Sequence, residues 1–345
     1  MKVKLTIAFI ISITALGIFA LNSCKKSQGR WPTTPLSFVV PSGFPQPAYD
    51  FVANPLSEEG FQLGKKLFYD GRLSKDSAYG CASCHQPVAA FTTFEHDRSH
   101  GYNHSHTLRN APGLANLAWY PYFYQDGKYK TLEEVSYAHI TAPNEMGENM
   151  EEVVGRLAHD TSYQRMFYNA YGTNQVTSDR ILDALKQFLL GMVSANSRYD
   201  AMKKGAASFS PQEQSGYAIF QSKCAVCHKE PLFTDFTFRN IGLPINPLLS
   251  DFGRMRITGD PSDSLKFRVL SLRNVPMTSY YAHDGRFSAF RLVIEHYRYS
   301  VVQSPTLDPL LQSGIQMTNN EEDDLVQFLF TLSDTSYVHN PRYLP

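Results

Sequence analysis

The chain of 345 residues has little cysteine and no net charge, and each shortage excludes a class of protein. It contains five cysteines, and four of them belong to two copies of one short motif, so no pair remains for a structural disulfide. Its 32 basic and 32 acidic residues balance, which argues against nucleic acid as a partner. With 43% apolar residues, the chain is long enough to build two compact domains.

The repeated motif is C-x-x-C-H, at Cys81–His85 and again at Cys224–His228. This pattern is the attachment signal for c-type haem, in which the thiols bond to the porphyrin and the histidine binds the iron. A redox disulfide and half of a zinc site are the alternatives. A zinc site needs two further ligands, and a redox pair needs no adjacent histidine. The sequence predicts two covalent haems, held by Cys81, Cys84, His85, Cys224, Cys227 and His228.

The N-terminus predicts export. Lys2 and Lys4 precede an apolar run over residues 5–21, as in a signal peptide. The run ends at Cys24 in a sequence similar to the lipobox of bacterial lipoproteins, in which the cysteine carries the lipid. An uncleaved anchor is the alternative, because about 17 apolar residues is the lower limit for spanning a membrane. We expect residues 1–23 to be a lipoprotein signal peptide, and the rest to lie on the periplasmic side, joined to the membrane only through Cys24.

Proline, capping residues and turns indicate the organisation of the remaining chain. Residues 24–56 are rich in proline and predict an extended tether. Residues 178–193 have the apolar stripe of an amphipathic helix. A turn-rich stretch at residues 203–205 predicts a boundary between an N-terminal domain, residues 57–205, and a C-terminal domain, residues 206–345. Other helices are predicted to begin at Ser57, Thr131, Asn149, Ser210 and Thr318.

The two halves repeat the same order of motifs. Each has a helix, then C-x-x-C-H, then Arg-Asn-x-Pro at residues 109–112 or 273–276, and then an aromatic-rich turn that ends in Asp-Gly. Strands are scarce in this pattern. The sequence therefore predicts a mostly α fold of two cytochrome c-like haem domains related by internal duplication.

From about residue 50 to 340 the chain resembles bacterial di-haem cytochrome c peroxidases and their relative MauG. In that family, peroxide reacts at the N-terminal haem and the C-terminal haem relays electrons. The resemblance implies a peroxidase that reduces hydrogen peroxide to water, with electrons from a small cytochrome c or cupredoxin, and it leaves a homodimer open. Besides both haem motifs, the matching stretches are residues 63–70, 109–112, 143–146, 258–261, 266–268, 271–275 and 283–285.

The resemblance also implies residues for each haem. Glu145 matches the catalytic glutamate of the distal pocket, which moves the peroxide proton to the leaving oxygen. Tyr297 stands where the peroxidases have a methionine ligand to the second iron and MauG has a tyrosine; His296 and Met277 are the alternatives. A loop histidine caps the first iron in the peroxidases. His100 fits that role best, His104 and His106 are the next candidates, and exposed loop histidines without such a role are the other interpretation.

Further positions follow from the same resemblance. Arg268 and Arg273 are expected to pair with haem propionates. Asn110, Thr278 and Tyr280 match a calcium site between the domains. Two positions depart from the family. Gln125 replaces a tryptophan that usually lies between the haems, and Val135 replaces a common distal glutamine. Electron relay then requires help from Tyr124, Tyr122 or Trp119, or it is slower.

Two other functions remain open at this point. A MauG-like oxidase of a protein or another partner is favoured by Tyr297 and disfavoured by Gln125. A di-haem electron carrier without enzymatic activity would leave Glu145 idle.

Overall fold

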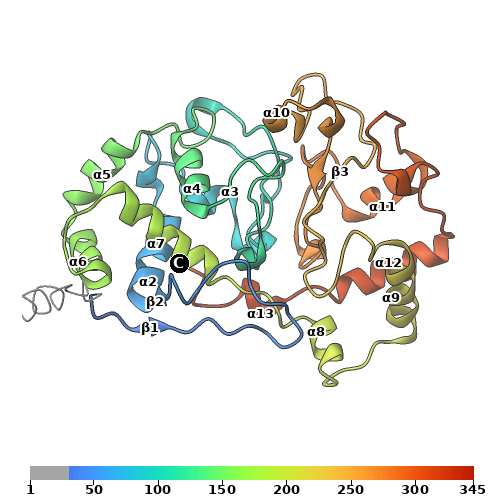
Figure 1. Ribbon diagram of the computed structural model, residues 1–345, viewed down its shortest axis with the longest axis horizontal. Coiled ribbons are helices and arrows are strands. Elements are labelled where there is room, and N and C mark those ends of the chain that lie inside the picture. The colour runs from blue at the N-terminus through green and yellow to red at the C-terminus, as the bar shows by residue number, and fades with distance from the viewer. Residues whose placement is uncertain (1–30) are drawn as a thin grey trace, which may run out of the picture. The chain divides into compact units, whose positions relative to one another are not determined.

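A computed structural model describes residues 31–345 (Figure 1). The predicted signal peptide and Cys24 lie outside the described residues. No helix in the described part is long and apolar enough to cross a membrane. Helices dominate, which confirms the predicted class. The four strands form two antiparallel pairs, β1 (Pro35–Leu36) with β2 (Leu56–Ser57) and β3 (Phe238–Arg239) with β4 (Phe267–Arg268).

The helices fall into two series along the chain. The first half contains α2 (Glu58–Tyr69), α3 (Cys81–Cys84), α4 (Leu132–Thr141), α5 (Met150–Ala158), α6 (Thr161–Tyr171) and α7 (Ser178–Leu190). After α8 (Arg198–Lys203) come α9 (Pro211–Lys223), α10 (Met255–Thr258), α11 (Phe290–Tyr299), α12 (Asn319–Phe330) and α13 (Thr335–Val338). Short 3₁₀ turns lie at Gly71–Leu73, Pro87–Ala89, Tyr102–His104, Leu117–Trp119, Pro261–Asp263, Val275–Met277 and Pro309–Leu311.

The predicted capping residues begin their helices. The Ser57 side chain accepts a hydrogen bond from Gly60 N at the start of α2, and Asn149 does the same for α5. Thr131, Ser210 and Thr318 each form a complete capping box with the glutamate three residues later. These bonds satisfy backbone N–H groups that have no partner inside the helix. Local sequence therefore determines where these helices start.

One pair of crossing helices forms the centre of each half, α2 with α7 and α9 with α12 (Figure 1). Each pair has a glycine where the backbones approach. A Cβ added at Gly64 would lie 1.9 Å from Ala184 O, and one added at Gly216 would lie 1.9 Å from Asp324 O. No other residue type permits so close an approach. The internal duplication thus extends from the motifs to the helix packing.

Buried apolar side chains gather in two clusters. The first draws mainly on residues 56–192 and the second on residues 199–332. The core changes between residues 192 and 199, slightly before the domain boundary predicted at residue 205. Tyr337 and Tyr343, at the end of the chain, return to the first cluster. The second half of the sequence therefore contributes to the core of the first.

The proline-rich segment is not an extended tether over all of residues 24–56, and this part of the prediction is wrong from residue 33 onward. β1 pairs with β2, and Phe38, Phe44 and Phe51 pack against the first cluster. Trp119 Nε1 also donates a hydrogen bond to Pro45 O at 2.8 Å. The prolines do prevent a helix, but the aromatic rings between them bury enough apolar surface to hold the segment in place.

We expect Gly64→Ala and Gly216→Ala each to lower the free energy of unfolding by about 1–3 kcal/mol, because the new methyl group forces the crossing helices apart. Gly155 in α5 is the matched control, since nothing lies within 4 Å of an added Cβ there. Gly155→Ala should instead stabilise the protein by roughly 0.5–1 kcal/mol through helix propensity. Urea unfolding of the haem-loaded protein, followed by circular dichroism, measures all three. Equal effects at the three glycines would contradict this interpretation.

Candidate active site

The first C-x-x-C-H motif forms α3 and the residue that caps it. Cys81 and Cys84 lie on this single turn, and His85 follows directly. The Nδ1 atom of His85 lies 3.0 Å from Phe91 O. Burial, with a further contribution from His139, lowers the pKa of His85 to about 4. The ring is therefore neutral. Nδ1–H donates to the carbonyl and Nε2 is left as the atom that can bind iron.

The second motif repeats this arrangement. The Nδ1 atom of His228 lies 3.2 Å from Phe233 O, and burial lowers the pKa of His228. Burial also raises the thiol pKa of Cys81 and of Cys224 to about 12, the opposite of a reactive redox pair. No group of three His, Cys, Asp or Glu side chains in the described chain is arranged to hold a metal ion, so a zinc site lacks its further ligands. Covalent haem is the remaining interpretation of both motifs.

Glu145 lies near the first motif. Its charge contributes to the raised thiol pKa of Cys84, for which burial is the larger cause, and it also acts on His85. The Oε2 atom of Glu145 contacts Nδ1 of His139, which projects from α4. The Tyr124 ring stacks on the His139 ring, with centroids 5.1 Å apart and planes at 23°. The His139 imidazole therefore contacts both a carboxylate and a phenol near the first motif.

His139 was not predicted from the sequence, although a signal was present. It follows Val135 by one turn of α4, so both residues face the same side of the helix. Val135 is the position at which a distal glutamine is expected, and its side chain packs against the first core cluster. A polar residue one turn later on that face could therefore have been considered for the pocket.

The histidine-rich loop lies at the surface. The His100 ring packs between those of His96 and His106, with centroid distances of 4.6 and 4.7 Å, and all three residues are exposed. The backbone carbonyl of His100 lies 4.0 Å from Cys84 Sγ, so the loop passes the first motif. His104 is also exposed. A role for His100 as a ligand to the first iron stays a prediction.

A cavity of about 350 Å³ lies beside the second motif. Cys224, Cys227, His228 and Tyr297 are all part of its wall. Burial, followed by the nearby thiols, raises the pKa of the Tyr297 hydroxyl. Tyr297 therefore faces the space next to His228 in which a porphyrin would lie.

The other donors considered for this position lie elsewhere. His296 and Met277 are not part of the cavity wall. The Nε2 atom of His296 lies 2.8 Å from Ile241 O, and Met277 packs against the first core cluster. Met317 does line the cavity and was not predicted. Tyr297 and Met317 are thus two side chains in this wall that could donate to an iron, and His283 is a third.

The residues predicted to bind calcium also border this cavity. Asn110, Thr278 and Tyr280 all line it. The backbone N–H of Asn110 donates to His283 O at 2.8 Å, and Gln125 Nε2 donates to Asn110 O at 2.9 Å. The first of these bonds joins the first half to the second, and the second holds Asn110 within the first half. Calcium itself stays a prediction.

Comparison with known proteins places this geometry in a family. Residues 58–208 match the family model described as di-haem cytochrome c peroxidase. The chain is 32% identical to the methylamine utilization protein MauG of Methylorubrum extorquens, with 92% of this chain and 91% of MauG covered. It is 31% identical to the cytochrome c551 peroxidase of Nitrosomonas europaea, with 81% of each chain covered. The chain belongs to the di-haem cytochrome c peroxidase and MauG family.

A solved structure supports the same conclusion. The crystal structure of a MauG-like protein associated with microbial copper homeostasis is 32% identical and superposes with a TM-score of 0.82, covering 89% of this chain and 98% of that one. The predicted family is therefore confirmed, and membership in a di-haem family implies c-type haem at both motifs.

The cavity beside the second haem motif has side chains that fit a haem. Two buried polar atoms of its wall, Arg268 Nε and His283 Nδ1, have no hydrogen-bond partner among residues 31–345. The Arg268 side chain lies over the Tyr120 ring, and burial lowers its pKa. Burying a guanidinium charge without a carboxylate partner destabilises the folded protein unless a bound anion pairs with it. A haem propionate supplies such an anion, so Arg268 suits its predicted role.

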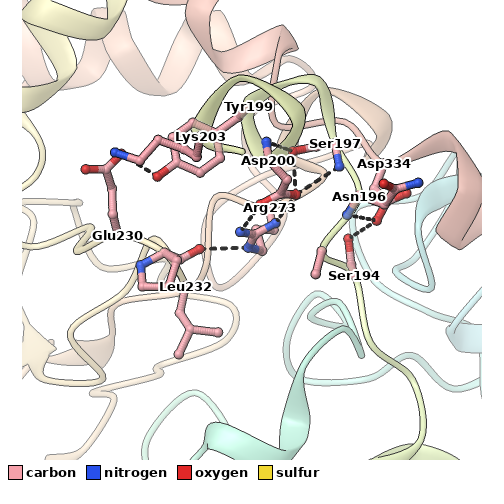
Figure 2. Close-up of polar contacts among 12 residues, drawn as sticks. Ser194, Asn196, Ser197, Tyr199, Asp200, Lys203, Glu230, Leu232, Arg273 and Asp334 are labelled. Atoms are coloured by element: carbon pink, nitrogen blue, oxygen red, sulfur yellow. Dashed lines mark hydrogen bonds and ion pairs between the residues drawn. The ribbon is translucent and has the colours of Figure 1, made fainter. Parts of the chain in front are cut away.

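Arg273 also lines this cavity, but its guanidinium already has a carboxylate partner in the protein. Its guanidinium donates to both carboxylate oxygens of Asp200, at 2.9 and 2.8 Å, and to Pro231 O at 2.8 Å (Figure 2). Burial alone would raise the pKa of Asp200, but the bonds and charge of Arg273 hold it below its usual value. Arg273 therefore joins α8 to the second half of the molecule, and the propionate role stays a prediction.

Further buried bonds surround this pair. The carboxylate of Asp334 accepts hydrogen bonds from Ser194 Oγ and Asn196 N, at 3.0 Å each (Figure 2). Asn274 Nδ2 donates to Ser194 Oγ at 3.1 Å. Buried hydrogen bonds to Asp334 and Asn274 thus hold residues 194–196, which belong to the segment that connects the two halves.

We expect Arg273→Met to lower the free energy of unfolding by about 3–5 kcal/mol, because it leaves the Asp200 carboxylate buried and unpaired. Arg198→Met is the control. Its ion pair with Glu213 is at the surface, with the arginine side chain 49% exposed, so its loss should change the stability much less than the loss of Arg273. Urea unfolding measures both variants.

The effect of Arg273→Met should depend on pH. Because the folded protein lowers the pKa of Asp200, the ion pair stabilises the protein above the ordinary aspartate pKa, and this contribution is lost as the pH falls through the folded-state value. The stability difference between wild type and Arg273→Met should therefore shrink below about pH 4. A difference that is constant with pH would contradict the ion-pair interpretation.

Proposed function

We propose that the chain is a di-haem peroxidase that reduces hydrogen peroxide to water at the His85 haem. The observation that carries this proposal is Glu145, an acid–base group beside the first motif, whereas the carboxylate in the wall of the cavity beside the second motif, Asp308, is paired with Arg239. When bound, each haem supplies an iron that can exchange electrons with peroxide or with a donor. His85 and His228 hold the two irons, each through Nε2.

Glu145 has the chemistry that peroxide cleavage requires. A carboxylate at the distal side can take a proton from one peroxide oxygen and return it to the other, so that the O–O bond breaks heterolytically and water leaves. The contact of Oε2 with His139 leaves Oε1 as the oxygen that can handle this proton. The surface histidine His100 would act by capping the first iron at rest, as in the peroxidases.

The second site would receive electrons from a small cytochrome c or cupredoxin. Tyr297 is the proposed further side chain that would hold the second iron, since a phenolate oxygen is a hard anionic donor that would lower the potential. Arg268 would bind a propionate there. Asn110, Thr278 and Tyr280 would hold one calcium ion near the junction of the halves. We also propose the division into two haem domains, export to the periplasmic side and lipid anchoring through Cys24.

Electron relay between the sites would involve Tyr124. Trp119 is engaged with the proline-rich segment through Pro45, and Tyr122 is 38% exposed. Tyr124 immediately precedes Gln125 and stacks on His139, so it lies between the first site and the junction of the halves. Its aromatic ring can support transfer that the Gln125 amide cannot.

Tyr297 favours a second candidate function. A tyrosine at this position is the MauG-like feature, and MauG proteins are among the relatives. The oxidising equivalents taken from peroxide would then oxidise a protein or another organic partner. Gln125 argues against this function, because the resemblance places an aromatic residue between the haems.

We expect Glu145→Gln to slow the reaction of peroxide with the first haem by about 10²–10⁴-fold, because an amide cannot take up the proton. Stopped-flow absorbance after one-electron reduction measures the rate. Glu151→Gln, at an exposed position of α5, is the control and should react like the wild type. A wild-type rate in Glu145→Gln would exclude the proposed role of this carboxylate.

We expect Tyr297→Met to give the second haem a thioether-ligated, low-spin spectrum and to raise its potential by on the order of 0.1 V, because a neutral sulfur stabilises the oxidised iron less than a phenolate does. Electron paramagnetic resonance and an optical redox titration measure both properties. Met317→Leu is the matched control and should leave them unchanged. A change of ligand field in Met317→Leu would instead identify Met317 as the ligand.

A further inference from the structure

His139 is the side-chain partner of the Glu145 carboxylate. Its Nδ1 atom contacts Glu145 Oε2, while one face of its ring is covered by Tyr124. The Tyr124 hydroxyl lies 3.4 Å from the same nitrogen. The imidazole is therefore held by a stacked ring on one side and by the carboxylate at its edge. Such a ring has little freedom to rotate, and its Nδ1–H points at Glu145.

The backbone around Glu145 is bound as firmly as the ring. Glu145 N donates to Ala142 O at 3.0 Å, and Glu145 O accepts from Tyr102 N at 2.6 Å. Met146 N donates to His139 O at 3.3 Å, so the turn folds back onto the end of α4. These bonds hold the backbone of Glu145 but not its side chain. The contact with His139 sets the direction of the Glu145 carboxylate.

The charges around the pair favour a proton on His139. Burial by itself lowers the pKa of His139, but the charge and hydrogen bond of Glu145 raise it above the usual value. Of the other groups, Tyr124 approaches from the loop before α4, and His85 and Cys84 face the pair from the first motif. The charges of Tyr129, Asp126 and Arg109 in turn contribute to the pKa of the Tyr124 hydroxyl.

We propose that His139 is a positioning residue for Glu145, and that its Nδ1–H holds the carboxylate toward the first haem in place of the amide that Val135 cannot supply. This inference rests on the proposed peroxidase function. Val135 has no polar atom in its side chain, whereas His139 lies one turn later on the same face of α4. His139 thus supplies a hydrogen-bond donor next to the Glu145 carboxylate, from a position one turn later in α4 than Val135.

The proton count follows from this arrangement. Glu145 Oε1 accepts one proton from peroxide and returns it to the oxygen that leaves as water, so Glu145 ends as it began. His139 keeps its proton throughout and only orients the carboxylate. In the complete reaction, hydrogen peroxide, two electrons that the donor supplies through the haem-loaded protein and two protons from solvent give two water molecules; the proton that Glu145 moves comes from the peroxide itself.

The test is a double-mutant cycle on the haem-loaded protein with Glu145→Gln, His139→Leu and the combined variant. We expect His139→Leu to lower the second-order rate of the peroxide reaction by about 10–100-fold, because Glu145 then loses its orientation. In the Glu145→Gln background the same substitution should change the rate by less than about threefold. His139→Gln, whose amide can still donate to Oε2, should remain within about threefold of the wild type.

A second measurement avoids turnover. Hydrogen cyanide must lose its proton as it binds ferric haem, so its optical binding rate reports the same carboxylate without peroxide. His139→Leu should slow this binding and His139→Gln should restore it. His159→Leu, at a surface histidine bonded to Gly155 O, is the matched control and should behave like the wild type. An unchanged absorption spectrum shows that each variant has folded around its haems.

The outcomes separate this inference from the proposed function. Wild-type rates in His139→Leu together with slow Glu145→Gln would overturn the role of His139 and leave the peroxidase proposal standing. A further loss when His139→Leu is added to Glu145→Gln would also overturn it, because His139 would then act independently of the carboxylate. Wild-type rates in both single variants would instead refute the proposed function of Glu145 itself.

Discussion

Each half of this protein depends on two helices that cross at a glycine. The carbonyl oxygens of Ala184 and Asp324 occupy the space that a side chain would need at Gly64 and Gly216. The crossings also place the haem motifs. The second motif begins directly after α9, and the loop before the first motif returns to the end of α2, where a Cβ at Gly80 would lie 3.2 Å from Phe68 O. Close backbone packing is therefore the condition on which both haem sites rest.

On this repeated scaffold the two sites differ in their chemistry. The iron-binding side is the same in both, with the histidine ring bonded through Nδ1 to a backbone carbonyl. The opposite sides diverge. The first site has a carboxylate held by an imidazole, which suits proton transfer, and the second has Tyr297 and the unpaired cation of Arg268, which suit a haem that stores and passes charge. The duplication accounts for the shared helix packing and haem motifs, and a few side chains distinguish the two sites.

The repeated Arg-Asn-x-Pro motif explains how the halves are joined. Arg109 donates two hydrogen bonds to the buried Asp251, at 2.6 and 2.8 Å, just as Arg273 does to Asp200. Arg109 thereby links the first half to the second, and Arg273 links the second half to the connecting segment. Both arginines act as buried structural cations, since a bidentate guanidinium–carboxylate pair fixes distance and angle together. Arg268, which lacks such a partner among the described residues, is the arginine left for a propionate.

The sequence by itself determined the helical class, the helix starts, the duplication and both haem motifs, because spacing and capping are local properties of a chain. Glu145 was identified only through the resemblance to the family. Tertiary structure alone decided the rest. The proline-rich segment packs on the first half, the C-terminal tyrosines return to the first core, Arg273 meets Asp200, and His139 meets Glu145. Most of these contacts join residues far apart in the chain. The contact of His139 with Glu145 spans only six residues but depends on the turn that folds back after α4. In each case the partner is selected by packing and burial, which no local pattern records.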